Sequence, residues 1–149
     1  MKVRDVMTTD VLTVGPEASF AEIVDALLTR GVSGLPVVDD SGRLLGIVTE
    51  ADLVSKEAYG PGRRRALGLL ADYFRGRDPQ WVRKSSGLTA SELMTAAPDS
   101  VAPDDDLVEA ARRMLERHHK RLPVLVDGRV VGILSRHDLL RSLGRHQAG

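Results

Sequence analysis

A seven-residue pattern occurs twice in the chain and constrains its fold more than any other feature. Residues 46–52 read Gly-Ile-Val-Thr-Glu-Ala-Asp, and residues 132–138 read Gly-Ile-Leu-Ser-Arg-His-Asp. Each copy predicts an apolar strand that contains a glycine and then turns, at a hydroxyl residue, into a helix. The hydroxyl residue and the aspartate three positions later have the spacing of a capping box. Two such turns indicate an internal duplication.

The rest of the sequence repeats at nearly the same spacing. Val6-Met7-Thr8 matches Leu93-Met94-Thr95, and Leu35-Pro36-Val37 matches Leu122-Pro123-Val124, both at an offset of 87 residues. The offset falls to 86 where the second copy is one residue shorter in a predicted hairpin turn, a place that tolerates length changes. The expected division is a first repeat at 1–55, an insert at 56–88, a second repeat at 89–143 and a tail at 144–149.

Each repeat predicts the order strand, helix, strand, strand, helix. In the first repeat a strand over 11–14 precedes a helix capped by Ser19, and strands over 35–38 and 44–48 lead to a helix from about Glu50. The expected fold class is α/β, with the two repeats related by a pseudo-twofold axis, their small sheets packed together and two equivalent clefts between them. The apolar faces of the first helices are expected at Phe20, Ile23, Val24, Leu27 and Leu28, and at Leu107, Ala110, Ala111, Met114 and Leu115.

Composition excludes several classes of protein. The 21 basic and 21 acidic residues balance, so the chain as a whole has no electrostatic attraction to nucleic acid. The chain has no cysteine, which excludes disulfides, thiolate metal sites and cysteine nucleophiles. No apolar run approaches the roughly 18 residues of a membrane-spanning helix, and the first residues do not resemble a signal peptide. We therefore expect a cytoplasmic protein that does not associate with membranes.

The insert at 56–88 differs from the repeats in charge. It carries a net charge of +5 and four of the five aromatic residues of the chain. Residues 66–74 have helical spacing. A linker helix with solvated arginines is the simplest interpretation, and a lid, a dimer contact or an anion-binding surface are the alternatives. A protein that binds a partner or nucleic acid through residues 63–84 is therefore the alternative function.

The two hydroxyl–aspartate turns are the best candidates for a ligand site. A lone Thr-x-x-Asp is usually only a helix cap, but here it occurs at equivalent places in both repeats, each time after a strand glycine. The free amides of a helix start attract phosphate, and a carboxylate can accept hydrogen bonds from a ribose diol. No catalytic set stands out, and His118 and His119 have no further ligand at metal-binding spacing. We expect neither an enzyme nor a metal site.

On these residues the sequence resembles the CBS (cystathionine-β-synthase-like) domains, which occur as tandem pairs called Bateman modules. The resemblance implies a regulatory module that binds an adenosyl ligand, AMP, ADP, ATP or S-adenosylmethionine, without requiring a cofactor. It also implies a parallel or antiparallel homodimer and an unidentified downstream protein. The likeness covers both repeats and rests on residues 5–8, 31–39, 42–49 and Asp52, and on residues 92–95, 120–126 and 132–138.

The resemblance further implies two pockets, in which the aspartate binds the ribose hydroxyls and the hydroxyl residue contacts phosphate. Lys120 and Arg121 could pair with phosphate in the first pocket, whereas Ser33 and Gly34 hold the matching places in the second. We therefore expect the Asp52 pocket to prefer phosphorylated ligands and the Asp138 pocket to tolerate less charge. The first pocket comprises Thr49, Asp52, Pro98, Val101, Lys120, Arg121, Leu122 and Pro123. The second comprises Val11, Leu12, Val32, Ser33, Leu35, Pro36, Ser135, Arg136, His137 and Asp138.

Overall fold

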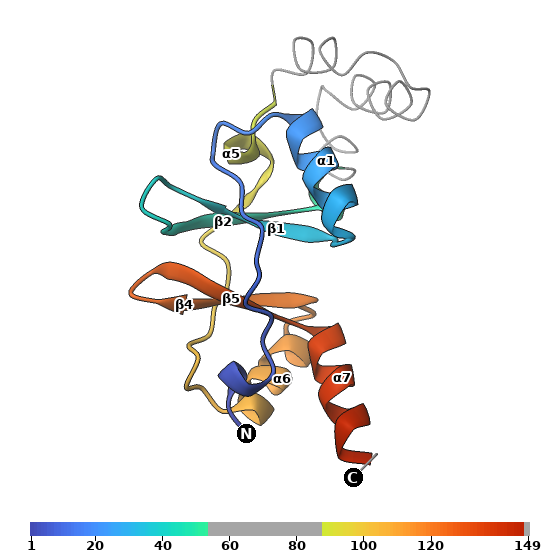
Figure 1. The fold of residues 1–149 in the computed structure, drawn as a ribbon. Helices are drawn as coiled ribbons and strands as arrows, with labels where there is room; N and C mark the ends of the chain where they lie inside the picture. The colour runs from blue at the N-terminus through green and yellow to red at the C-terminus, as the bar shows by residue number, and fades with distance from the viewer. Residues whose placement is uncertain (54–87, 148–149) are drawn as a thin grey trace. The chain divides into compact units, whose positions relative to one another are not determined.

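The computed structural model describes residues 1–53 and 88–147 (Figure 1). The helix expected at 66–74 and the basic residues of the insert lie outside the described residues. The chain divides into two compact units, which we name the α1 unit and the α6 unit after helices that they contain. The α1 unit consists of Leu12–Asp40 and Leu45–Ala96, and the α6 unit consists of Met1–Val11, Ser41–Leu44 and Ala97–Gly149.

The α1 unit combines a helix with a three-stranded sheet. Helix α1 (Phe20–Arg30) begins after Ser19, whose hydroxyl accepts a 3.2 Å hydrogen bond from the Glu22 N–H, so the predicted capping box is confirmed. Residues 50–53 are helical, as expected from the turn at Glu50. The sheet has the order β1 (Gly34–Val38), β2 (Leu44–Thr49) and β3 (Thr95–Ala96), and the short helix α5 (Ala90–Leu93) immediately precedes β3.

The α6 unit repeats this plan. Helix α6 (Leu107–Glu116) is capped by Asp106, whose carboxylate accepts from the Glu109 N–H at 3.0 Å. Residues 127 and 128 both have positive φ angles, 51° and 79°, and form the two-residue turn that favours a tight hairpin. The remaining elements are the 3-10 helix η1 (Val3–Asp5), the antiparallel strands β4 (Arg121–Val126) and β5 (Arg129–Ser135), and helix α7 (Arg136–Gln147).

Each sequence repeat begins with an opening segment that precedes its first helix. This segment packs into the core of the unit that holds the other repeat's first helix. Val3 is fully buried in the core of the α6 unit, where Met1 accepts a hydrogen bond from the Leu107 N–H at 3.0 Å. Ala90 and Leu93 are buried in the core of the α1 unit. Figure 1 shows the N-terminal segment beside α6. The compact units therefore exchange their opening segments, which the positions of the sequence repeats alone do not reveal.

The order strand, helix, strand, strand, helix is present, with two corrections. The strand expected over 11–14 is reduced to one parallel bridge between Val14 and Val37, because the chain passes from the α6 unit to the α1 unit after Val11. Leu28 and its counterpart Leu115 are not part of the buried helix faces, since they are 62% and 66% exposed. Periodicity could not decide which of two adjacent apolar residues at a helix end faces the core.

Candidate functional site

Both hydroxyl–aspartate turns fold as helix caps. The N–H and the hydroxyl of Thr49 donate to Oδ2 of Asp52 at 2.9 and 3.1 Å, and the Asp52 N–H donates to Thr49 Oγ1 at 3.2 Å. The corresponding distances between Ser135 and Asp138 are 2.9, 2.9 and 3.1 Å. The capping interpretation of the pattern is therefore realised in both copies. It uses one carboxylate oxygen, Oδ2, and leaves Oδ1 for another role.

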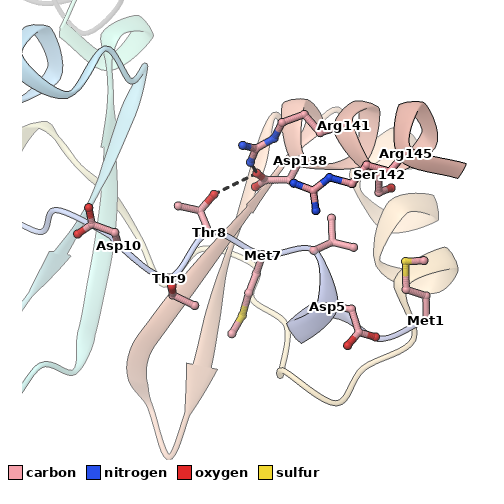
Figure 2. Close-up of a pocket in the computed structure, with 11 residues that line it drawn as sticks. Met1, Asp5, Met7, Thr8, Thr9, Asp10, Asp138, Arg141, Ser142 and Arg145 are labelled. Carbon is pink, nitrogen blue, oxygen red and sulfur yellow. Dashed lines mark hydrogen bonds and ion pairs between the residues drawn. The ribbon is translucent and has the colours of Figure 1, made fainter. Parts of the chain in front are cut away.

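The two aspartates differ at that second oxygen. Asp138 is only 2% exposed, and its Oδ1 accepts a 3.0 Å hydrogen bond from the Thr8 hydroxyl and an ion-paired hydrogen bond from Arg141 (Figure 2). Asp52 is partly buried, and within the described part of the chain only Thr49 donates to its carboxylate. Oδ1 is therefore occupied in Asp138, whereas none of the described residues donates to Oδ1 of Asp52.

A pocket of about 480 Å³ lies within the α6 unit, between the N-terminal segment and α7 (Figure 2). Carboxylates, guanidinium groups and hydroxyls line it together, so a ligand here would meet charges of both signs. Of its lining residues only Asp138 was predicted as a site residue. The match of residues 6–8 with residues 93–95 indicated that the N-terminal segment is part of the sequence repeat. The lining residues are Met1, residues 5–10, Asp138, Arg141, Ser142 and Arg145.

The strand glycines are explained by the packing of the chain itself. A Cβ added to Gly46 would lie 2.6 Å from both the sulfur of Met94 and the carbonyl oxygen of Thr95. A Cβ on Gly132 would lie 2.8 Å from the sulfur of Met7. Such distances leave no room for a side chain. The Met-Thr segments thus pack closely against these glycines, and the glycines by themselves do not argue for a ligand.

The other predicted site residues are distributed over both units, and each predicted pocket takes residues from both. The side chains of Leu35 and Leu122 are 1% exposed in the hydrophobic cores, so only their backbone can face a ligand. Lys120, Arg136 and His137 are exposed. The α1 unit holds Leu12, Val32, Ser33, Leu35, Pro36, Thr49 and Asp52, and the α6 unit holds Val11, Pro98, Val101, Lys120, Arg121, Leu122, Pro123, Ser135, Arg136, His137 and Asp138.

A charge cluster around Asp99 was not predicted. Arg117 Nη1 donates to Asp99 Oδ2 at 2.6 Å, His119 Nε2 lies 2.9 Å from the same oxygen, and Arg113 lies 3.6 Å from Oδ1. The hydrogen bonds from Arg117 and then from His119 hold the pKa of Asp99 below its ordinary value of 3.8. His118 and His119 follow the end of α6, which ends at Glu116. The carboxylate partner, distant in sequence, gave no signal.

Over residues 1–53 and 88–147, no three acidic or histidine side chains are placed to hold a metal ion. No helix in the same ranges combines the length and apolarity needed to cross a membrane. Ser135 donates to Asp138 as part of the cap, while His137 is exposed to solvent. In the described residues, these three side chains therefore do not form the hydrogen-bonded relay of a hydrolase.

These observations define a class of protein, a tandem α/β module whose two repeats each end in a capped hydroxyl–aspartate turn. The family model of the CBS domain matches residues 3–59 and 90–145. The chain belongs to the CBS-domain family and contains two CBS repeats, so the resemblance seen in the sequence is confirmed.

Relatives and solved structures agree with this assignment. The chain is 32% identical over 139 residues to the chloroplastic CBS domain-containing protein CBSX2 of Arabidopsis thaliana, covering 87% of this chain and 57% of the relative. The crystal structure of CBSX2 in complex with AMP matches with a TM-score of 0.75 at 30% identity, over 98% of both chains. The CBS domain pair of protein MJ0100, in complex with 5′-methylthioadenosine and S-adenosyl-L-methionine, matches with a TM-score of 0.71 at 25% identity, over 97% of this chain and all of the other. The chain spans less than two thirds of the length of the first curated relatives it matches.

Proposed function

We propose that this chain is a regulatory sensor that binds an adenosyl ligand, such as AMP, ADP, ATP or S-adenosylmethionine, and catalyses no reaction itself. The similarity to CBS pairs described in complex with AMP and with S-adenosyl-L-methionine supports the ligand class. The observation in this chain that carries the proposal is the carboxylate of Asp52. Oδ1 of this carboxylate accepts no hydrogen bond from the described residues, and Asp52 lies in the first turn of a helix.

The chemistry of this turn suits a nucleotide. An ionised carboxylate is an acceptor without a proton of its own, so an open oxygen can take a ribose hydroxyl. The amides of Glu50 and Asp52 at the start of the same helix already donate to the Ser33 carbonyl and to Thr49 Oγ1, so the positive end of the helix dipole supplies the attraction for a phosphate group. In this proposal Lys120 and Arg121 contribute positive charge near the phosphate. The rest of the pocket consists of Thr49, Pro98, Val101, Leu122 and Pro123, as the family resemblance implies.

We also propose that the chain pairs with a second copy of itself. Leu140 and Leu143 on α7 are 65% and 61% exposed, and three-residue spacing places them on one helix face. Val108 and Leu115 on α6 are 78% and 66% exposed and lie two turns apart on one face. Exposed apolar surface of this kind marks interaction sites. A ligand that favours one geometry of the pair could then signal to a downstream protein.

A thermal-shift panel tests the ligand class. AMP, ADP, ATP and S-adenosylmethionine are compared with GMP, and at a concentration 100 times its Kd a bound ligand should stabilise the fold by about 2.7 kcal/mol. We expect a shift with at least one adenosyl compound and none with GMP. No shift with any adenosyl compound, together with no heat of binding by calorimetry, would overturn the proposal.

The Asp52→Asn variant tests the site. The asparagine oxygen should keep the cap by accepting from Thr49, which places the amide NH₂ where Oδ1 now stands. The variant therefore replaces the open acceptor by a donor while preserving the helix start. We expect it to lose at least tenfold in affinity, whereas Asp104→Asn, a surface aspartate paired with Lys2 and Arg4, should bind as the wild type does.

A further inference from the structure

All four acceptor positions of the Asp138 carboxylate are filled. Oδ2 accepts from the N–H and the hydroxyl of Ser135, and Oδ1 accepts from Thr8 and from Arg141. A carboxylate offers about four lone-pair positions in total. A ribose hydroxyl therefore cannot bond to Asp138 in this arrangement unless one of the present donors leaves.

The partner that can leave is Arg141. Thr8 is fixed on β5 by two backbone hydrogen bonds with Ile133, both of 2.9 Å, and the turn hydroxyl of Ser135 belongs to the cap. The Arg141 side chain is 51% exposed, so its guanidinium can exchange the carboxylate for water. Figure 2 shows the Arg141 side chain reaching Asp138, and both residues line the pocket. Separating a cation from a carboxylate that is 2% exposed costs free energy, because the carboxylate loses its counter-charge.

The first repeat lacks this arginine in its sequence. At the offset of 86 that relates the two turns, Arg141 corresponds to Ser55. The threonine of the opposing segment occurs in both repeats, as Thr8 and Thr95. Within the described residues, Asp52 accepts hydrogen bonds from Thr49 alone. Among the described residues, the hydrogen bond from Thr8 and the ion pair with Arg141 distinguish Asp138 from Asp52, and of these two donors only Arg141 lacks a counterpart in the first-repeat sequence.

We propose that Arg141 is a positioning residue that makes the two turns unequal in their affinity for ligand. Together with Thr8 it occupies Oδ1 of Asp138. The Asp52 turn therefore binds ligand first, and the Asp138 turn binds ligand only when Arg141 withdraws. This inference rests on the proposed adenosyl-binding function. It assigns a specificity-determining role to a residue outside the hydroxyl–aspartate pattern. The affinity of the second turn is reduced by the free energy needed to release the guanidinium.

Calorimetric titration with AMP in an Asp52→Asn background isolates the second turn. Adding Arg141→Ser, which installs the first-repeat residue, should tighten AMP binding at least tenfold over Asp52→Asn alone. Adding Arg112→Ser instead removes an equal charge from the exposed surface of α6, where Arg112 pairs with Glu109 and Glu116 outside the pocket lining, and should change the affinity less than twofold. Adding Asp138→Asn to the tightened variant should abolish the gain, which a purely structural role of Arg141 would not predict.

Two results overturn the inference and leave the proposed function intact: equal AMP affinity with and without Arg141→Ser, or equal gains from Arg141→Ser and Arg112→Ser. Failure of the wild type to bind any adenosyl compound overturns the proposed function instead. Circular dichroism and thermal melting confirm that each variant is folded. If Arg141→Ser does not fold, Thr8→Val provides the same test, because it removes one of the two Oδ1 donors and should raise the affinity in the same direction by a smaller factor.

Discussion

The sulfur of Met7 lies so close to Gly132 that a Cβ added to the glycine would be 2.8 Å from it. The same relationship recurs between Met94 and Gly46 in the α1 unit, where a Cβ would be 2.6 Å from the sulfur. In both units the methionine belongs to the segment that has been exchanged between the sequence repeats. The glycine and the Met-Thr segment are therefore one packing arrangement, present twice.

Gly132→Ala should destabilise the chain by about 1–3 kcal/mol, the usual cost of overpacking a close contact. The added methyl would also lie 2.9 Å from the carbonyl oxygen of Thr8, and backbone cannot yield as a side chain can. Urea denaturation measures the loss. The matched control is Gly144→Ala in α7, where an added Cβ meets nothing within 4 Å. This substitution should stabilise the folded chain by about 0.5–1 kcal/mol. A neutral Gly132→Ala would show that the N-terminal segment does not hold this position in solution.

The sequence predicted the order of helices and strands well because each local sequence pattern occurs in both repeats. The cap at Ser19, the strands on either side of the hairpins and the helix starts at both turns follow local rules, and each is found. The exchange of opening segments was not predictable, since the residues of 1–11 and 88–96 are similar enough to fit either core. Contacts such as His119 with Asp99 were also inaccessible, because neither residue alone suggests the other.

The geometry of the candidate site was predicted only in part, because part of it depends on contacts between segments distant in the sequence. The pattern predicted that both aspartates lie in capped helix starts, as the structure shows, but periodicity and spacing describe one segment at a time. Whether Oδ1 of Asp138 is open depends on Thr8, which is 130 residues away, and on an arginine that looks like an ordinary helix surface residue. Burial of Leu35 and Leu122 likewise depends on the core around them.

Asp138→Asn should destabilise the fold by about 1–3 kcal/mol, and Asp52→Asn by less than about 1 kcal/mol. Both asparagines can preserve the cap through their oxygen. Only in Asp138→Asn does the new NH₂ face the guanidinium of Arg141, so the buried acceptor of that cation is replaced by a donor, which can donate to the Thr8 hydroxyl but not to Arg141. Chemical denaturation of the two variants side by side makes the comparison. Equal losses would indicate that Arg141 contributes nothing to the stability of this turn.

Asp99→Asn should remove a pH-dependent contribution to stability. The pKa of Asp99 is held below its ordinary value of 3.8, chiefly by Arg117 and then by His119, so the ionised carboxylate is favoured in the folded state. This stabilisation is complete above the unfolded-state pKa and is lost as the pH falls through the folded-state pKa. At neutral pH we expect the variant to be less stable by about 0.5–1 kcal/mol.

Thermal unfolding of wild type and Asp99→Asn between about pH 5 and about pH 2 tests this sign. The two curves should converge as the pH falls, because protonation of Asp99 removes from the wild type the charge that the variant never had. Asp104→Asn serves as the control, since the 64% exposed side chain of Asp104 should contribute little. A gap between wild type and Asp99→Asn that stays constant over this pH range would contradict the assignment.

Charged substitutions on α7 should weaken self-association if the proposed pairing uses that helix. Leu140 and Leu143 are 65% and 61% exposed, and an acidic group in place of either would have to be desolvated in an apolar contact. We expect Leu140→Glu and Leu143→Glu to weaken the dimer at least tenfold in sedimentation equilibrium. Val126→Glu, an equivalent change at a 45% exposed position at the end of β4, should leave the dimer unchanged. A wild-type monomer at all concentrations would exclude the pairing, and an unaffected dimer in both leucine variants would place the contact elsewhere.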